Sequence, residues 1–438
     1  MYTPFDFTLC PDSHLRCGFT LRTMEVTMQV NGIIAEYNPF HNGHKYQMEE
    51  ARRRTSASYT VIAMSGNFVQ RGAPALVDKH SRAEMALRCG ADLVLELPTL
   101  YACSSAEYFA SGAVALLDRL GVVTHLCFGS ECGDVTVLSR IAEILADEPA
   151  EYSSALKRFM QQGYSYPNAR VNALMQLYPF LEGHWQVFSS PNNILAIEYI
   201  KILHRRNCAI QPVTTKRTGA GYHDRQTDTE ICSALALRQA LYAGSVPEQL
   251  GGHMPPEAAL ILTDRLSKNR LLRSNDLSLM LHYKLLLERD HGYQDYLDVS
   301  PDLSARIRNR LDEYVDFDSF CDLLKTKEMT YNRISRCLLH ILLDITKTDM
   351  EMGRAMDYVP YARILGFRKG SEPLLSAIKE KSSIPLVSKL ADAEDILDPA
   401  AYAMLRQDVL AGEVYQSAVS AGTARPSANE YSTPLAIL

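Results

Sequence analysis

The chain has 438 residues, 47% of them hydrophobic and 22% charged, which is the composition of a globular protein of about two or three domains. Its net charge of −6 excludes RNA binding through overall charge, so an RNA partner would need a local basic face. Its ten scattered cysteines, without a CxxC pair, are typical of reduced thiols in a cytoplasmic protein, and no apolar run approaches the ~18 residues of a membrane span.

The first segment, residues 1–27, carries charges throughout and lacks an apolar stretch of signal-peptide length. Met24 and Met28 stand directly before the first convincing strand. We therefore expect residues 1–27 to be an extension that is disordered or precedes the native start of the chain.

The next part of the chain alternates strands and helices. Apolar runs from Val30, Tyr59, Ala91 and Val123 predict four strands, and the segments between them have helical signals. After a more helical stretch, "CAIQPVTTKR" from Cys208 predicts a last strand that returns to the sheet. This alternation predicts an α/β fold with a Rossmann-like parallel sheet.

Beyond about residue 230 the pattern becomes almost wholly helical, with apolar residues recurring at a period of about 3.6. We therefore expect a Rossmann-like domain at 28–228 and an all-helical domain at 229–418. The polar tail at 419–438 is expected to be disordered.

The most informative stretch is "EYNPFHNGH", where the first strand ends and a helix begins near Asn42. In an open parallel sheet, ligands bind beyond the carboxyl ends of the strands. Gly43 lets the backbone approach a ligand, and a helix N-terminus offers free N–H groups to a phosphate. His41 and His44 suit an α-phosphoryl group under attack, because imidazoles can donate to its oxygens. Taken alone, two histidines near a helix start are more often surface or capping groups.

Strand–HxGH–helix is the signature of the nucleotidylyltransferase superfamily, and further motifs narrow the match. These are "SGNFVQRGAPALVDKHSRAEMALRCGADLVLELP", "CFGSECGD", "PNNILAIEYIK", "TKRTGAGYHD" and "YARILGF". Together with "EYNPFHNGH", they resemble the bacterial tRNA(Met) cytidine acetate ligases, from Met28 to about Gln416.

The resemblance implies a ligase reaction. ATP and acetate would give acetyl-adenylate and pyrophosphate, and the acetyl group would pass to the wobble cytidine of elongator tRNA(Met), giving N4-acetylcytidine without acetyl-CoA. Mg²⁺ is inferred because ATP chemistry usually requires it. Glu131 and Asp134 are candidates for helping to hold it, although no spacing in the chain demands a metal site.

The same resemblance implies the residues of the site. His41 and His44 would be the catalytic pair. The implied ATP-binding residues are Ile34, Ala35, Glu36, Tyr37, Asn38, Pro39, Phe40, His41, Asn42, Gly43, His44, Lys45, Tyr46, Gln47, Gly129, Asn192, Asn193, Arg217 and Thr218.

Several of these assignments keep an alternative. Phe40 either packs beneath the nucleotide or belongs to the core, and the sequence does not show whether Asn192 or Asn193 binds ATP. Gly129 is either a simple turn glycine or a residue whose missing side chain admits the adenine or ribose. Arg217 either clamps the departing pyrophosphate or makes a surface salt bridge.

A polar block formed by Gln70, Arg71, Lys79 and Arg82 precedes and enters a predicted helix. These side chains could line an entrance for acetate or tRNA. Each one singly is more often part of a solvated face.

Basic clusters offer surfaces for an RNA backbone. In "RLSKNRLLR", Arg265, Lys268 and Arg273 fall roughly at helical spacing and would share a face, with a solvated helix face as the alternative. The helical domain is therefore the expected tRNA-binding part.

Two other classes of function stay open. One is an adenylyltransferase that acts on a small phosphorylated metabolite, and the other is a non-catalytic RNA-binding factor that keeps an ATP fold. The long helical half favours tRNA over a small metabolite, and the intact HxGH histidines argue against a non-catalytic role. The sequence indicates neither an acetate pocket nor an oligomeric state.

Overall fold

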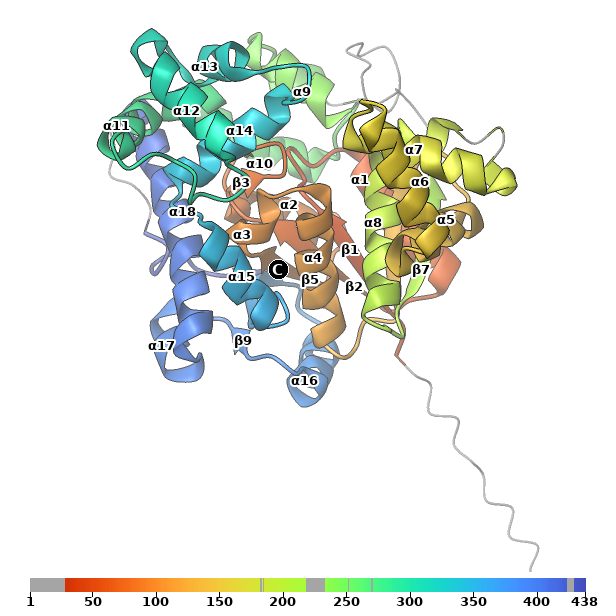
Figure 1. Ribbon diagram of the computed structural model, residues 1–438. Helices are drawn as coiled ribbons and strands as arrows, with labels where there is room; N and C mark the ends of the chain where they lie inside the picture. The colour runs from red at the N-terminus through yellow and green to blue at the C-terminus, as the bar shows by residue number, and fades with distance from the viewer. Residues whose placement is uncertain are drawn as a thin grey trace, which may run out of the picture.

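The computed structural model describes residues 28–217, 233–423 and 429–438, apart from positions 182, 184, 251, 269 and 270 (Figure 1). The predicted extension at 1–27 and Thr218 lie outside the described residues. Within them, no helix is both long and apolar enough to cross a membrane.

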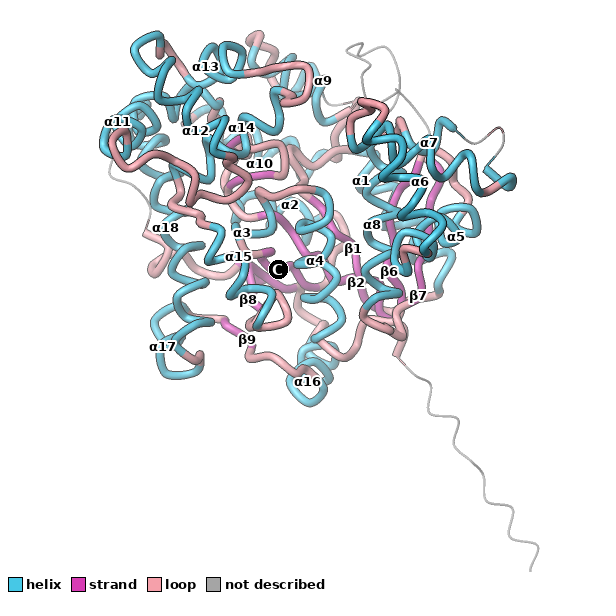
Figure 2. The backbone as a smooth tube through the Cα atoms, viewed as in Figure 1, coloured by secondary structure: helices cyan, strands magenta, loops and turns pink. Residues whose placement is uncertain are grey.

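The predicted parallel sheet is present and forms the centre of the molecule (Figure 2). Its strands follow the order β10-β8-β5-β2-β1-β6-β7, and β1, β2, β5, β6 and β7 pair in parallel. These five parallel strands are the five that the sequence predicts, which confirms the α/β fold class. Their bounds are β1 Val30–Ala35, β2 Tyr59–Ser65, β5 Leu93–Leu97, β6 His125–Ser130 and β7 Gln211–Lys216.

Helices cover both faces of this sheet, because alternate residues of each strand point to opposite sides. Ile62 and Ile33 pack in one apolar cluster with residues of α1 and α2, whereas Val61 and Leu95 pack in another with residues of α4. The bounds of the helices in this half are α1 Asn42–Thr55, α2 Lys79–Arg88, α3 Thr99–Ala102, α4 Ala106–Arg119, α5 Val135–Asp147, α6 Ala150–Gln161, α7 Tyr166–Leu177 and α8 Pro191–Arg205.

The C-terminal half is mainly helical, as predicted, and packs beside the sheet (Figure 1). Its helices are α9 Ala234–Tyr242, α10 Pro256–Ser267, α11 Ser278–Glu288, α12 Pro301–Arg310, α13 Phe317–Leu324, α14 Tyr331–Leu342, α15 Lys347–Ala355, α16 Glu372–Lys381, α17 Ala393–Ile396 and α18 Pro399–Thr423.

The predicted division at residue 228 is wrong in one respect, because strands of the C-terminal half join the main sheet. Strand β8, Ala362–Phe367, pairs antiparallel with β5, and it is flanked by β9, Leu386–Val387, and β10, Ala436–Ile437. The motif "YARILGF" is therefore a strand of the ATP-fold sheet. A short apolar run in a helical context does not reveal by periodicity which sheet it joins.

The disordered tail predicted at 419–438 is also contradicted. Helix α18 continues to Thr423, and β10 pairs with β8 through Ala436 and Ile437. Between them, the buried Glu430 carboxylate forms ion pairs with Lys79 and Arg363. The polar composition of the tail misled because its one buried carboxylate finds partners far away in the sequence.

Candidate active site

The loop after β1 is held by a buried arginine. Arg82 is fully buried on α2, and its guanidinium donates hydrogen bonds to the carbonyl oxygens of Glu36 at 2.6 Å, Ser65 at 3.0 Å and Val77 at 3.0 Å. It therefore joins the carboxyl ends of β1 and β2. The interpretation of Arg82 as part of a solvated face is wrong, since its partners are backbone carbonyls that sequence spacing does not reveal.

The two histidines cap the first turn of α1 reciprocally. The Gly43 N–H donates to Nδ1 of His41 at 3.0 Å, and the His41 N–H donates to Nδ1 of His44 at 3.2 Å. Because both Nδ1 atoms accept, both rings carry their hydrogen on Nε2. The rings stack with centroids 3.7 Å apart, so the pair presents two N–H donors side by side.

Both imidazoles are held neutral. Burial, with the nearby Arg217 and Arg238, lowers the pKa of His41 to about 3. Burial, followed by His41 and Arg217, lowers the pKa of His44 well below its ordinary value. At neutral pH the pair can therefore donate hydrogen bonds to an anion but brings no charge of its own, and the positive charge comes from the arginines.

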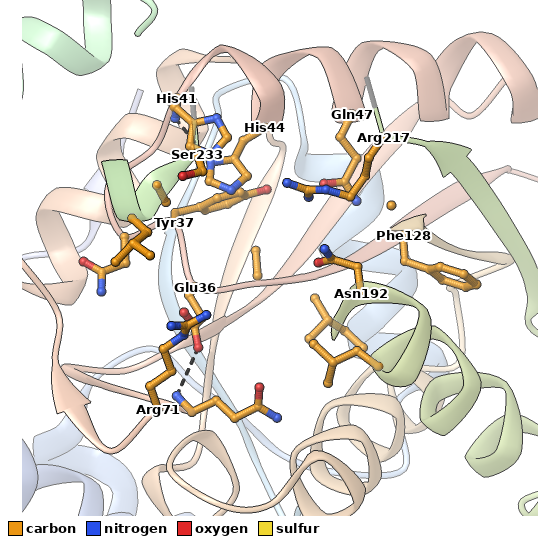
Figure 3. A pocket seen from close by; sticks show the side chains of 18 of the residues that line it. Glu36, Tyr37, His41, His44, Gln47, Arg71, Phe128, Asn192, Arg217 and Ser233 are labelled. Carbon is orange, nitrogen blue, oxygen red and sulfur yellow. Dashed lines mark hydrogen bonds between the residues drawn. The ribbon is translucent and has the colours of Figure 1, made fainter. Parts of the chain in front are cut away.

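These side chains open into a cavity of about 210 Å³ at the carboxyl ends of the parallel strands (Figure 3). The predicted ATP residues that line it are Ile34, Ala35, Glu36, Tyr37, Asn38, His41, His44, Gln47, Gly129, Asn192 and Arg217. The position agrees with the rule that ligands bind beyond the carboxyl ends of such strands.

The other predicted ATP residues do not border this cavity. They are Pro39, Phe40, Asn42, Gly43, Lys45, Tyr46 and Asn193. Phe40 is fully buried in the apolar core, in line with its alternative assignment. The expectation of free N–H groups at the start of α1 is wrong, because the Asn42 N–H donates to the His253 carbonyl at 2.9 Å and the Gly43 N–H is capped by His41.

The two asparagines at the start of α8 differ in position. Asn192 borders the cavity, whereas the side-chain oxygen of the buried Asn193 accepts the backbone N–H groups of Glu131 at 2.9 Å and Cys132 at 3.2 Å. Asn193 therefore shapes the loop that follows Gly129. The geometry favours Asn192 as the residue that meets a ligand.

Gly129 makes room for a neighbouring side chain. A Cβ at this position would come within 3.3 Å of Cγ of Arg217. Arg217 itself is exposed and forms no ion pair with a described residue, so the surface salt bridge proposed as its alternative is not seen in that part of the chain.

The two carboxylates suggested for magnesium are already engaged. Glu131 accepts from the Asn192 side chain at 2.6 Å and from the Asn193 N–H at 2.9 Å, and Asp134 caps α5 through Thr136. Among the described residues, no three His, Cys, Asp or Glu side chains gather as a metal site. Neither carboxylate borders the cavity, so the structure gives no support for a role of either in holding magnesium there.

Part of the cavity wall comes from residues outside the ATP-binding set that the family resemblance implies. Gln70 and Arg71 line it from the turn between β3, Phe68–Val69, and β4, Ala73–Pro74, and Arg238 reaches it from α9. The remaining lining residues are Phe109, Phe128, Leu195, Tyr199, Ser233, Ala234 and Leu235. Gln70 and Arg71 belong to the polar block that the sequence offered as an entrance for acetate or tRNA, whereas nothing near Arg238 distinguishes it from a surface residue.

The basic cluster of "RLSKNRLLR" does not form one helix face. Helix α10 ends at Ser267, so Arg273 lies outside it and packs over the Tyr242 ring. Arg265 lies 3.9 Å from Asp78, and Lys268 pairs with Asp264 at 2.7 Å. The helical spacing failed because the helix stops in the middle of the cluster.

Comparison with known sequences identifies the family to which the chain belongs. The sequence model of the HIGH nucleotidyl transferases matches residues 28–430, and the chain belongs to that family. Within it, the chain belongs with the tRNA(Met) cytidine acetate ligases. The relative of that name in Acetivibrio thermocellus is 39% identical over 94% of this chain and 100% of its own length, and the one in Clostridium kluyveri is 41% identical over 89% and 98%.

Solved structures agree with this assignment. A crystal structure of Thermotoga maritima TmcAL bound with alpha-thio ATP has a TM-score of 0.87 and 32% sequence identity, covering 94% of this chain and all of that one. The apo form of the same protein gives a TM-score of 0.88. The fold and the family predicted from the sequence are thus confirmed.

Proposed function

We propose that the protein is an ATP-dependent ligase that acetylates the wobble cytidine of elongator tRNA(Met) through acetyl-adenylate. The observation that carries the proposal is the neutral His41–His44 pair, which faces a cavity at the carboxyl ends of the strands. Acetate and tRNA as co-substrates are supported by the names of full-length relatives, which are tRNA(Met) cytidine acetate ligases.

The polar groups of the cavity suit a nucleotide triphosphate. Arg71, Arg217 and Arg238 border it, and the buried hydroxyl of Tyr37 has no hydrogen-bond partner among the described residues. An anion with several oxygens would satisfy such groups. The related TmcAL was crystallised with an ATP analogue, which supports the same use of this cavity.

The proposed roles follow from position. Asn192 and Gly129 lie against the nucleoside, His41 donates to the α-phosphoryl oxygens, and His44 with Arg217 holds the two departing phosphates. An acetate oxygen attacks the α-phosphorus, and the bond from that phosphorus to the bridging oxygen of pyrophosphate breaks. The bonding electrons leave with pyrophosphate, and acetyl-adenylate remains.

The second step transfers the acetyl group. The N4 amine of the cytidine attacks the acetyl carbonyl, AMP leaves with the electrons of the carbonyl–oxygen bond, and the amine loses one proton. We propose that the helices within 229–418, and not the strands β8 and β9 of that range, hold the tRNA, because adenylate formation alone does not need so much additional surface. We also place the reaction in the cytoplasm, in line with the free thiols of the described cysteines.

Mg²⁺ would accompany the nucleotide and neutralise phosphate charge. Glu36 is the one carboxylate among the described residues that border the cavity, so the ion would take most of its oxygen ligands from phosphates and water.

One assay tests the proposal. Purified protein is incubated with ATP, labelled acetate and total bacterial tRNA, and label is sought in N4-acetylcytidine of tRNA(Met). Exchange of pyrophosphate into ATP is measured in parallel, with acetate and without tRNA. Acetate-dependent exchange and labelled tRNA(Met) are expected. Exchange that ignores acetate and requires a phosphorylated metabolite would instead identify an adenylyltransferase.

A further inference from the structure

The cavity has two ends with different charges. At one end lie His44, Gln47 and Arg217, from α1 and β7. Figure 3 shows Arg71 beside Glu36 on the side of the cavity away from Arg217. The roles proposed above account for the first end but leave the second without a ligand.

The second end carries more positive than negative charge. Arg71 and Arg238 both border the cavity, where burial lowers the pKa of each guanidinium and the Glu36 carboxylate opposes that shift. Glu36 is the single carboxylate on the described wall of the cavity. Two guanidinium groups against one carboxylate leave a net charge of about +1 in a half-buried place, where a small anion is favoured.

Arg238 also holds the backbone at this end of the cavity. Its guanidinium donates to the Asn38 carbonyl at 2.6 Å and so holds the loop that follows β1. Arg71 comes from the β3–β4 turn, and the turn itself is fixed on both sides. The Gly72 N–H donates to the Val69 carbonyl at 2.9 Å, and the Ser335 hydroxyl donates to the Gly72 carbonyl at 2.8 Å.

The close packing of this turn requires glycine. Gly72 has a φ of +77°, and a Cβ on it would lie 2.4 Å from the backbone nitrogen of Arg336 in α14. The turn is therefore pressed against the C-terminal half of the molecule. Arg71 is thus presented to the cavity from a closely packed, hydrogen-bonded backbone, which is the arrangement expected of a residue that positions a substrate.

The geometry of in-line displacement indicates which ligand binds at the second end of the cavity. The nucleophile attacks the α-phosphorus from the side opposite the departing pyrophosphate. If Arg217 and His44 hold pyrophosphate, the nucleophile enters from the side of Arg71 and Glu36. We propose that Arg71 binds the carboxylate of acetate there and orients its attacking oxygen. This inference rests on the proposed function, since it names the binding site of one of its substrates.

The test measures the Michaelis constant for acetate in acetate-dependent ATP–pyrophosphate exchange at saturating ATP. Arg71→Met should raise this constant about tenfold to a hundredfold, the usual effect of losing one hydrogen-bonded charge. Arg71→Lys keeps the positive charge but loses the paired N–H donors of the guanidinium. Its Michaelis constant for acetate should lie between those of Arg71→Met and the wild type. Titration with alpha-thio ATP should give a dissociation constant within about threefold of wild type, because the nucleotide lies on the other side.

A matched control is Arg88→Met. Arg88 is an exposed arginine of α2 that pairs with Glu84 at 2.8 Å, and its loss should leave both constants unchanged. Thermal unfolding checks that each variant is folded. If Arg71→Met does not fold, Arg71→Lys alone tests the role of Arg71.

The outcomes separate this inference from the proposed function. An unchanged acetate constant in Arg71→Met, with normal wild-type exchange, would overturn the role of Arg71 and leave the ligase function standing. A parallel loss of alpha-thio ATP binding would also overturn it, because Arg71 would then belong to the nucleotide site. Wild-type exchange that does not depend on acetate would overturn both.

Discussion

Two groups of inward-facing charges in this molecule differ in how they are balanced. We call the first the Lys79 network; it consists of Lys79, Glu96, Arg363 and Glu430. In it, two cations meet two carboxylates at 2.7–2.9 Å, and all four residues are buried. The second is the active-site cavity, where three arginines face Glu36 alone among the described lining residues.

The difference indicates which charges act within the fold and which serve a ligand. The Lys79 network is complete, so its ion pairs join α2, β5, β8 and the C-terminal segment without needing a further ion. The cavity keeps surplus positive charge and two neutral N–H donors, so an anion completes it. Burial and the balance of charge both distinguish the two groups, because the cavity arginines are half-buried or exposed and outnumber the one carboxylate among them.

The largest expected effect comes from breaking the Lys79 network. Lys79→Met would leave two buried carboxylates beside the single cation of Arg363, and the free energy of unfolding should fall by about 3–5 kcal/mol. Urea unfolding measures it. Lys268→Met, which removes an exposed partner of Asp264, should change stability by less than about 0.5 kcal/mol. Equal effects of the two substitutions would refute the distinction.

The next effect comes from the cavity and falls on catalysis. His44→Ala should slow acetate-dependent exchange by more than about a hundredfold, the scale for losing one transition-state donor, and should cost about 1 kcal/mol of stability, because His44 accepts the His41 N–H. His41→Ala should slow exchange similarly and also cost about 1 kcal/mol of stability, because His41 accepts the Gly43 N–H at the helix start. Exchange rates and thermal melts check both. Wild-type turnover in both variants would remove the pair from the chemistry.

The sequence predicted the parts of this comparison unevenly. The five parallel strands and the place of His41 and His44 followed from local patterns, namely apolar runs, a helix start and a family motif. Those signals depend on residues close together in the chain, which is why they survive without a structure.

The Lys79 network could not be predicted in this way. Lys79 resembles a solvated helix residue in the sequence. Its partners are Glu96 on strand β5 and Glu430 in the C-terminal segment, both far from it along the chain. Arg238 of the cavity shows the same limit, since only the packing of α9 brings it to the loop after β1. Long-range partners decide whether a charge is paired, and no local pattern encodes them.

The smallest effect is a pH dependence confined to the cavity. Buried among arginines, His41 has its pKa lowered to about 3, whereas an unfolded histidine titrates near 6.5. A group whose pKa is lower in the folded state contributes stability that is full above pH 6.5 and is lost as the pH falls toward 3, because protons bind the unfolded chain first. Between pH 6.5 and 5 this loss is roughly 1–2 kcal/mol.

His41→Gln should therefore flatten the fall of the melting temperature in that window, whatever its absolute value at pH 7. His204→Gln, at an exposed histidine beside Asp147, should leave the slope as in the wild type. Parallel slopes for wild type and His41→Gln would mean that His41 is charged in the folded protein, and the cavity would then already hold a cation where the structure places a neutral donor.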